Sequence, residues 1–207
     1  MCLKQVGLIS LSLINSNALA MEATPSRNRR SAPQTVAEFE KWLAHRKTDA
    51  NYEFVRGRII KKPAMKQEEL FIVDFLIRKF VKSAAFNQGD NLLTEFDSYV
   101  DVFRKRVPDL AFFNKEQIKI TKLGKRVMPS FTIEVLSDSE SQNDVFEKVQ
   151  DYFDGGVKLV WYIAPKQQKI YAYTSPDDIK VYKGQDTCSA APVVPDFQFV
   201  VDDLFNA

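Results

Sequence analysis

The chain has 207 residues, of which 45% are hydrophobic and 16 are phenylalanine, so it has enough apolar material for one sizeable globular core. Its 29 basic and 27 acidic residues give a formal net charge of +2, which neither requires nor excludes a polyanionic partner. Two cysteines and one histidine exclude a disulfide framework, a cysteine-based zinc site and a multi-histidine metal site. Any metal here would need oxygen ligands.

The first 20 residues resemble a secretory signal in part. Lys4 precedes the apolar run VGLISLSLI, and residues 18–20 read Ala-Leu-Ala, a small-x-small end. The run is too short to span a bilayer, and Met21 opens a plausible soluble protein. We therefore expect a cytoplasmic protein without a membrane segment, with the secreted form as the alternative. Residues 1–34 are expected to be an extension that is disordered or precedes the true start, and residues 35–207 a single domain.

Helices and strands alternate through the first half of that domain. Thr35 is expected to cap a short helix, and YEFVRGRIIKK reads as a hairpin around Arg56-Gly57. A helical period of apolar residues runs from Lys66 to about Ala85. The run LLTEFDSYVDVF alternates apolar and polar residues, as a strand with one buried face does.

The second half predicts a central sheet. VPDLAFF and FTIEVLS are more uniformly apolar than the preceding run, as inner strands are, and SESQNDVFEKVQDYF follows them as an amphipathic helix. KLVWYIAP, KIYAYTS and DIKVYKG read as three further β segments. The unit from Glu134 to Trp161 should form two parallel strands joined by a right-handed crossover helix. The fold class is α/β, with a central mixed sheet flanked by helices.

Two carboxylates within the inner strands suggest a metal site. Asp109 and Glu134 would converge at one end of the sheet, where they could share Mg²⁺, which prefers oxygen ligands. Lys148, on the following helix, could position an attacking water or stabilise developing charge in phosphodiester hydrolysis. The alternative is structural: an aspartate after proline often begins a strand, and a lone helical lysine is usually solvated. Glu134 is harder to explain in that way, because an unpaired buried carboxylate is costly.

The ordered pieces YEFVRG, VPDLAFF, IEVLSDSES, DVFEKVQDYFDGGV, WYIAP, VVPDF and DDLF resemble the bacterial Uma-type restriction endonuclease family, within the PD-(D/E)xK nuclease superfamily. The resemblance runs from about residue 35 to the C-terminus. It implies a restriction-endonuclease-like core of a helix, three strands, a helix and a strand. It also implies metal-dependent cleavage of DNA.

Carried over residue by residue, the resemblance makes Asp109 and Glu134 the metal ligands and Glu53 an auxiliary acid. The superfamily lysine should lie two residues after Glu134, but that position is Leu136. In such members the lysine is thought to move to the next helix, where Lys148 matches.

Asp144 and Tyr152 lie four residues on either side of Lys148 and could support it, although Tyr152 could equally be a core aromatic. A histidine that many relatives carry at the opening of the first long helix is missing. Glu68 or Glu69 is the candidate replacement there as an outer metal ligand.

Basic residues flank the predicted site in sequence. A phosphate-binding rim would use such residues, although most lysine clusters are simply solvated surface. The candidates for nucleic-acid contact are Arg56, Arg58, Lys61, Lys62, Arg104 and Arg106.

The leading hypothesis is a Mg²⁺-dependent DNA endonuclease, with Mn²⁺ as a substitute metal and no small-molecule organic cofactor. Cutting both strands would favour a homodimer. The alternative is a catalytically silent nuclease fold that binds nucleic acid or a protein partner.

Overall fold

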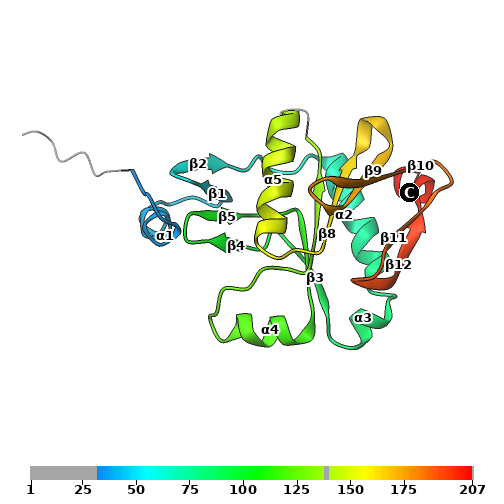
Figure 1. Ribbon diagram of the computed structural model, residues 1–207, viewed down its shortest axis with the longest axis horizontal. Helices are drawn as coiled ribbons and strands as arrows, with labels where there is room; N and C mark the ends of the chain where they lie inside the picture. Colours follow the sequence, from blue (N-terminus) through cyan, green and yellow to red (C-terminus); the bar gives the residue numbers. More distant parts are fainter. Residues whose placement is uncertain (1–31, 138–139, 207) are drawn as a thin grey trace, which may run out of the picture. The chain divides into compact units, whose positions relative to one another are not determined.

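The computed structural model describes residues 32–137 and 140–206 (Figure 1). The signal-like segment 1–20 lies outside these residues. The first elements are α1 (Val36–Ala44), β1 (Tyr52–Val55), β2 (Arg58–Lys61), α2 (Gln67–Phe80), α3 (Ala84–Asn87), β3 (Asn91–Thr94), β4 (Ser98–Asp101), β5 (Arg104–Arg106), β6 (Leu110–Phe113) and α4 (Lys115–Lys122). They are followed by β7 (Phe131–Val135), α5 (Gln142–Asp154), β8 (Leu159–Ala164), a 3-10 turn (Pro165–Gln167), β9 (Lys169–Ser175), β10 (Asp178–Lys183), β11 (Thr187–Ala190), β12 (Val194–Val200) and α6 (Val201–Phe205).

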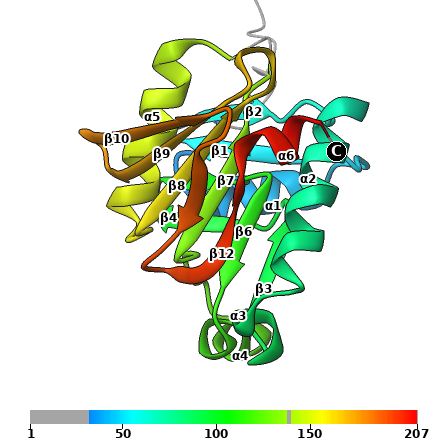
Figure 2. The ribbon, with the colours of Figure 1, turned by 90° about the vertical axis from the view of Figure 1, so that its right-hand side faces the viewer.

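A six-stranded mixed sheet forms the centre, in the order β10-β9-β8-β7-β6-β3. Strands β7 and β8 pair in parallel and the other neighbours pair antiparallel, so the predicted parallel unit around α5 is confirmed. Helix α5 covers one face, whereas α2, α6 and the β11–β12 hairpin cover the other (Figure 2). The predicted α/β class with a mixed sheet between helices is therefore correct.

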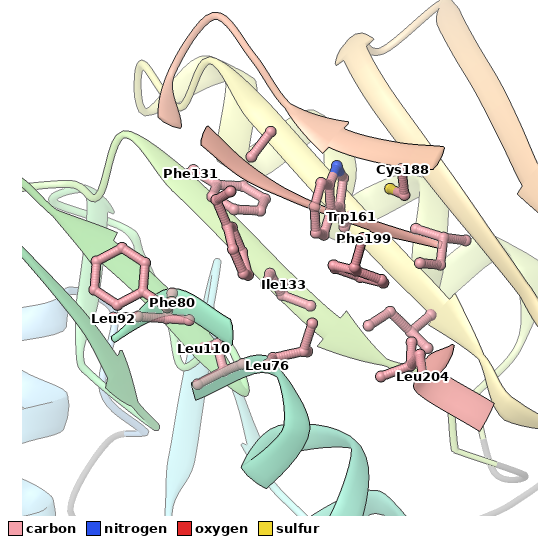
Figure 3. Packing of buried hydrophobic residues seen from close by; sticks show 14 of the residues in the cluster. Leu76, Phe80, Leu92, Leu110, Phe131, Ile133, Trp161, Cys188, Phe199 and Leu204 are labelled. Carbon is pink, nitrogen blue, oxygen red and sulfur yellow. The ribbon is translucent and has the colours of Figure 1, made fainter. Parts of the chain in front are cut away.

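The main core lies on the α2 face of the sheet. Phe131, Ile133 and Trp161 are fully buried there and pack with α2 and β12 (Figure 3). The alternate residues of the same strands face α5, where Tyr162 and Tyr152 belong to a second cluster. Because successive strand residues point to opposite faces, Glu134 shares the α5 face with Tyr162, its partner in the β7–β8 register.

A second, four-stranded sheet, in the order β2-β1-β5-β4, carries the N-terminal hairpin. Arg56 and Gly57 both have positive φ angles, 47° and 85°, as a two-residue hairpin turn requires. Helix α1 packs on this sheet through Phe39, whose ring stacks on Phe54 at 5.2 Å. Thr35 caps α1 as predicted, accepting a hydrogen bond from the backbone of Glu38.

Three local predictions need correction. The long helix ends at Phe80, and a separate turn of helix follows it, capped by Ser83. The run after Asp90 is two strands in different sheets, because the chain turns at Glu95, which has φ 47°. The segment between β6 and β7, for which the sequence predicted no helix, contains α4, whose start is fixed by a capping box between Asn114 and Gln117.

No helix within residues 32–137 and 140–206 combines the length and apolar character needed to cross a membrane.

Candidate active site

The β6–β7 register brings Asp109 opposite Glu134. Leu110 pairs with Ile133 in this antiparallel ladder, so the next position along places the two acids side by side. Leu110 and Ile133 point into the main core, and the acids therefore point to the α5 face. Both are buried, with 5% of Asp109 and 2% of Glu134 exposed. The sheet thus holds two carboxylates together where a single carboxylate would already be costly.

Asp109 is bound through both oxygens. Oδ2 accepts a hydrogen bond of 2.6 Å from the backbone N–H of Val135. Oδ1 lies 2.7 Å from Nζ of Lys62, which follows β2 in the N-terminal sheet. The same ammonium donates to the carbonyl oxygen of Val107 at 2.6 Å. Burial opposes the charge of Lys62, but Glu134 and Asp109 outweigh that effect and raise its pKa, so this lysine is fully protonated.

Two side chains of α5 contact the carboxylate of Glu134. The hydroxyl of Tyr152 donates a hydrogen bond to Oε1, and Nζ of Lys148 lies 3.7 Å from the same atom. Burial raises the pKa of Glu134 to about 7, and the charge of Asp109 adds to the increase, whereas Lys148 and Lys62 oppose it. A cation placed between the two acids would remove this penalty.

Helix α5 positions Lys148 beside the two acids Asp109 and Glu134. Its N-terminus is fixed by a capping box, in which Ser141 accepts from the backbone of Asp144 and the Asp144 carboxylate accepts from the backbone of Ser141. Nζ of Lys148 also lies 2.7 Å from Oε1 of Glu140. Burial works against its charge, but Glu134, Glu53 and Glu140 raise its pKa. Lys148 is therefore a fixed positive charge and not a base at neutral pH.

Both carboxylate oxygens of Glu53 accept hydrogen bonds from the protein itself. Its Oε2 accepts a hydrogen bond of 2.8 Å from Arg106, and its Oε1 accepts one of 3.1 Å from the backbone N–H of Val107. Burial opposes ionisation, but Lys148 and Arg106 lower the pKa of Glu53 overall. Glu53 lines the same pocket as the other acids, and its ion-pair partner is Arg106 of β5.

The predicted basic rim is corrected at two positions. Arg104 and Arg106 are 9% and 2% exposed, and both are bound to Asp151 of α5 at 2.6 Å. They join the four-stranded sheet to α5 and do not face a surface rim. Arg56 and Arg58 are exposed but reach Glu147 at 3.5 Å and 2.5 Å.

Lys62, also assigned to the rim, lies inside the site, and only Lys61 remains an exposed side chain without a described carboxylate contact. At the start of α2, Glu69 lines the pocket and accepts from the backbone of Lys66 at 2.8 Å, whereas Glu68 is exposed.

These groups surround a pocket of about 220 Å³. Its seven acidic residues outnumber the four basic ones, Lys61, Lys62, Arg106 and Lys148. The acids are Glu53, Glu69, Asp109, Glu134, Glu140, Asp144 and Glu147. A phosphodiester would be repelled by this excess of negative charge unless a cation compensated for it.

The acid pair suits a hard divalent cation. Within the described parts of the chain, no group of three or more His, Cys, Asp or Glu residues is arranged to hold a metal. Magnesium does not need such a group, because it is usually bound by one or two carboxylates together with waters and substrate phosphates. Asp109 and Glu134 are two carboxylates that could serve in this way.

Sequence reasoning missed two features of this pocket. Glu140 contacts Lys148, and Lys62 contacts Asp109. Glu140 lies just before the helix cap Ser141, a position that would have placed it at the strand-to-helix turn. Lys62 gave no such signal, because its role depends on contact between residues 47 positions apart.

Comparisons with known proteins identify the family and the fold of the chain. Residues 36–202 match the family model Uma2, described as "Putative restriction endonuclease". A solved structure from Anabaena variabilis, titled as a putative nuclease belonging to DUF820, has the same fold. It matches with a TM-score of 0.71 at 23% sequence identity, over 84% of this chain and 98% of that one. Curated proteins give no match. The family resemblance found in the sequence is confirmed.

Proposed function

The chain belongs to the Uma2 family of restriction endonuclease-like proteins, and from that premise we propose that it is a metal-dependent DNA endonuclease. The observation that carries the proposal is the buried pair Asp109, immediately before β6, and Glu134, on β7, set opposite each other in an acidic pocket. Each acid has a buried lysine beside it, but an ion pair that is only structural does not require two carboxylates side by side. Binding of a divalent cation and a phosphodiester would explain why the two carboxylates lie together.

The residues would divide the work by their chemistry. Asp109 and Glu134 would hold Mg²⁺ or Mn²⁺, which when bound polarises a phosphoryl oxygen and acidifies a water molecule. Lys148, kept protonated by its carboxylate neighbours, would stabilise negative charge that develops on the phosphate. Tyr152 would fix the orientation of Glu134, and Arg106 would hold Glu53 in the wall of the pocket.

The proposal includes three further points. The substrate is DNA, and exposed Arg56, Arg58 and Lys61 near the pocket would contact its backbone. Two copies would pair if both strands are cut, since closed two-fold symmetry matches the symmetry of a duplex. The site of action is the cytoplasm, where a free buried thiol such as Cys188 is usual.

Plasmid nicking tests the proposal. The parent chain should nick supercoiled DNA with Mg²⁺ or Mn²⁺ and not with EDTA. Glu134→Gln and Asp109→Asn should each reduce the rate by about a hundredfold or more, because each removes a charge from the metal site. Asp177→Asn, at an exposed position between β9 and β10, is the matched control and should cleave normally.

Two results would overturn this function. Undiminished cleavage by Glu134→Gln or Asp109→Asn would show that the acid pair is not the active site. Salt-sensitive DNA binding without any Mn²⁺ binding or cleavage would indicate the alternative, a silent nuclease fold that binds nucleic acid.

A further inference from the structure

The ammonium of Lys62 occupies the position on Asp109 that a cation would need. Of the two carboxylate oxygens, Oδ2 is used by the backbone N–H of Val135 at 2.6 Å. Oδ1 lies 2.7 Å from Nζ of Lys62. A divalent cation on Asp109 would therefore have to share or take over the oxygen that Lys62 now holds.

Backbone and side-chain hydrogen bonds hold Lys62 in this position. Its backbone N–H donates to the carbonyl oxygen of Asn51 at 2.9 Å, which fixes the end of the β1–β2 hairpin. Its side chain is 9% exposed, and its second bond, to the carbonyl oxygen of Val107, is 2.6 Å long. The contact is thus not a loose surface ion pair but a buried charge-assisted hydrogen bond.

A neighbouring hollow could accommodate the side chain of Lys62 after its displacement from Asp109. Lys62 lines the acidic pocket and also a second hollow of about 680 Å³, together with Asp49 and Leu70. A lysine has a flexible four-carbon stem, so its ammonium can leave Asp109 while its backbone stays in the hairpin. Lys148 does not compete in the same way, because its close contacts are with Glu134 and Glu140.

We propose that Lys62 is a resident counter-ion of Asp109 that competes with the divalent cation for Oδ1 and so weakens metal binding. The proposal rests on the function proposed above. In the metal-free protein Lys62 neutralises Asp109, and in the loaded protein the metal replaces that ammonium. Lys62 thereby sets the cation concentration at which the site fills.

Calorimetric titration of the full chain with Mn²⁺, without DNA, tests this competition. Lys62→Met and Lys62→Gln should each bind Mn²⁺ about tenfold to a hundredfold more tightly than the parent, the range expected from removing one charged hydrogen bond. Lys82→Met, an exposed lysine at the end of α2, removes the same charge away from the pocket and should bind like the parent. Damage to the fold would weaken binding, so tighter binding cannot come from a structural defect.

Thermal unfolding gives a second readout. Without metal, the neutral Lys62 variants should melt below the parent, and saturating Mn²⁺ should raise their melting temperature by more than it raises that of the parent. Equal Mn²⁺ affinities in the parent and both neutral variants would overturn the role of Lys62 and leave the nuclease function intact. Absence of Mn²⁺ binding in all of them would overturn both proposals.

Discussion

The hydroxyl of Tyr152, in the last turn of α5, donates a hydrogen bond to Oε1 of Glu134 on the central strand β7. Lys148, one turn earlier on the same helix, approaches that oxygen at 3.7 Å. One helix therefore supplies two groups that hold a single buried carboxylate oxygen. The position of α5 and the ionisation of Glu134 are linked by this contact.

Tyr152→Phe should destabilise the protein at pH 8. Glu134 would stay buried but lose its hydroxyl donor, and such a loss at a charged group costs about 1–3 kcal/mol in the free energy of unfolding. Urea unfolding followed by circular dichroism measures this difference.

Tyr162→Phe is the matched control. Tyr162 lies beside Glu134 in the β7–β8 register and is as deeply buried, but its hydroxyl finds no hydrogen-bond partner among the described residues. Its removal should change the unfolding free energy by less than about 0.5 kcal/mol or be stabilising. Equal losses in the two variants would mean that the bond to Glu134 is not what stabilises α5.

The raised pKa of Glu134 predicts a pH dependence of stability without metal. Its carboxyl has an ordinary value of 4.5 in the unfolded chain and about 7 in the folded one. Between these values the folded state keeps a proton that the unfolded state releases, so the unfolding free energy falls as pH rises. In EDTA, the unfolding free energy of the parent should fall by about 3 kcal/mol between pH 4.5 and 7, relative to that of Glu134→Gln. Parallel pH profiles for the two proteins would contradict the prediction.

The strand and helix patterns predicted the centre of the site from sequence. Apolar runs on either side of Asp109 and Glu134 identified inner strands, and the amphipathic spacing around Lys148 identified the crossover helix. The antiparallel register then makes the two acids neighbours. The strands and the helix could be predicted because each depends on residues close together in the chain, whereas the register between the two strands comes from the structure.

The basic side chains that pair with the buried acids could not be predicted in this way. Arg104-Lys105-Arg106 looks like a solvated basic run, but Arg106 lies 2.8 Å from Glu53 and 2.6 Å from Asp151, from two other elements. Lys62 likewise looks like part of a basic hairpin until the fold places it on Asp109. Local sequence gives charge and period, but it does not show which distant carboxylate will neutralise a cation.

Arg106→Met should therefore be a severe structural mutation. It would leave Glu53 and Asp151 buried without their shared partner, and breaking a buried ion pair from one side costs about 3–5 kcal/mol. Arg58→Met is the control, because Arg58 is 55% exposed and its pair with Glu147 should be worth less than about 1 kcal/mol. Denaturant unfolding compares them. A loss as small as that of Arg58→Met would mean that the buried ion pairs of Arg106 do not stabilise the fold.

Lys148→Met should slow cleavage by about a hundredfold or more, because it removes the fixed positive charge beside Glu134. Its Mn²⁺ affinity should not fall, since no metal ligand is lost. Single-turnover nicking at saturating Mn²⁺ separates these effects, with Lys82→Met as the control of equal charge change. A normal rate in Lys148→Met would mean that another group, such as Lys62, supplies the charge in the transition state.

A lysine at position 136 tests whether the place of the ammonium matters or only its presence. Leu136 lies two residues after Glu134, immediately beyond the end of β7, and packs partly buried against the cluster under α5. Leu136→Lys in the Lys148→Met background should therefore bring an ammonium to Glu134 from the strand instead of the helix. We expect about tenfold of the lost rate to return in the nicking assay, a partial recovery because burying a lysine in that cluster is costly. Leu136→Met in the same background is the control and should recover nothing. If the lysine variant is as slow as this control, the charge has to come from α5, where Glu140 fixes its direction.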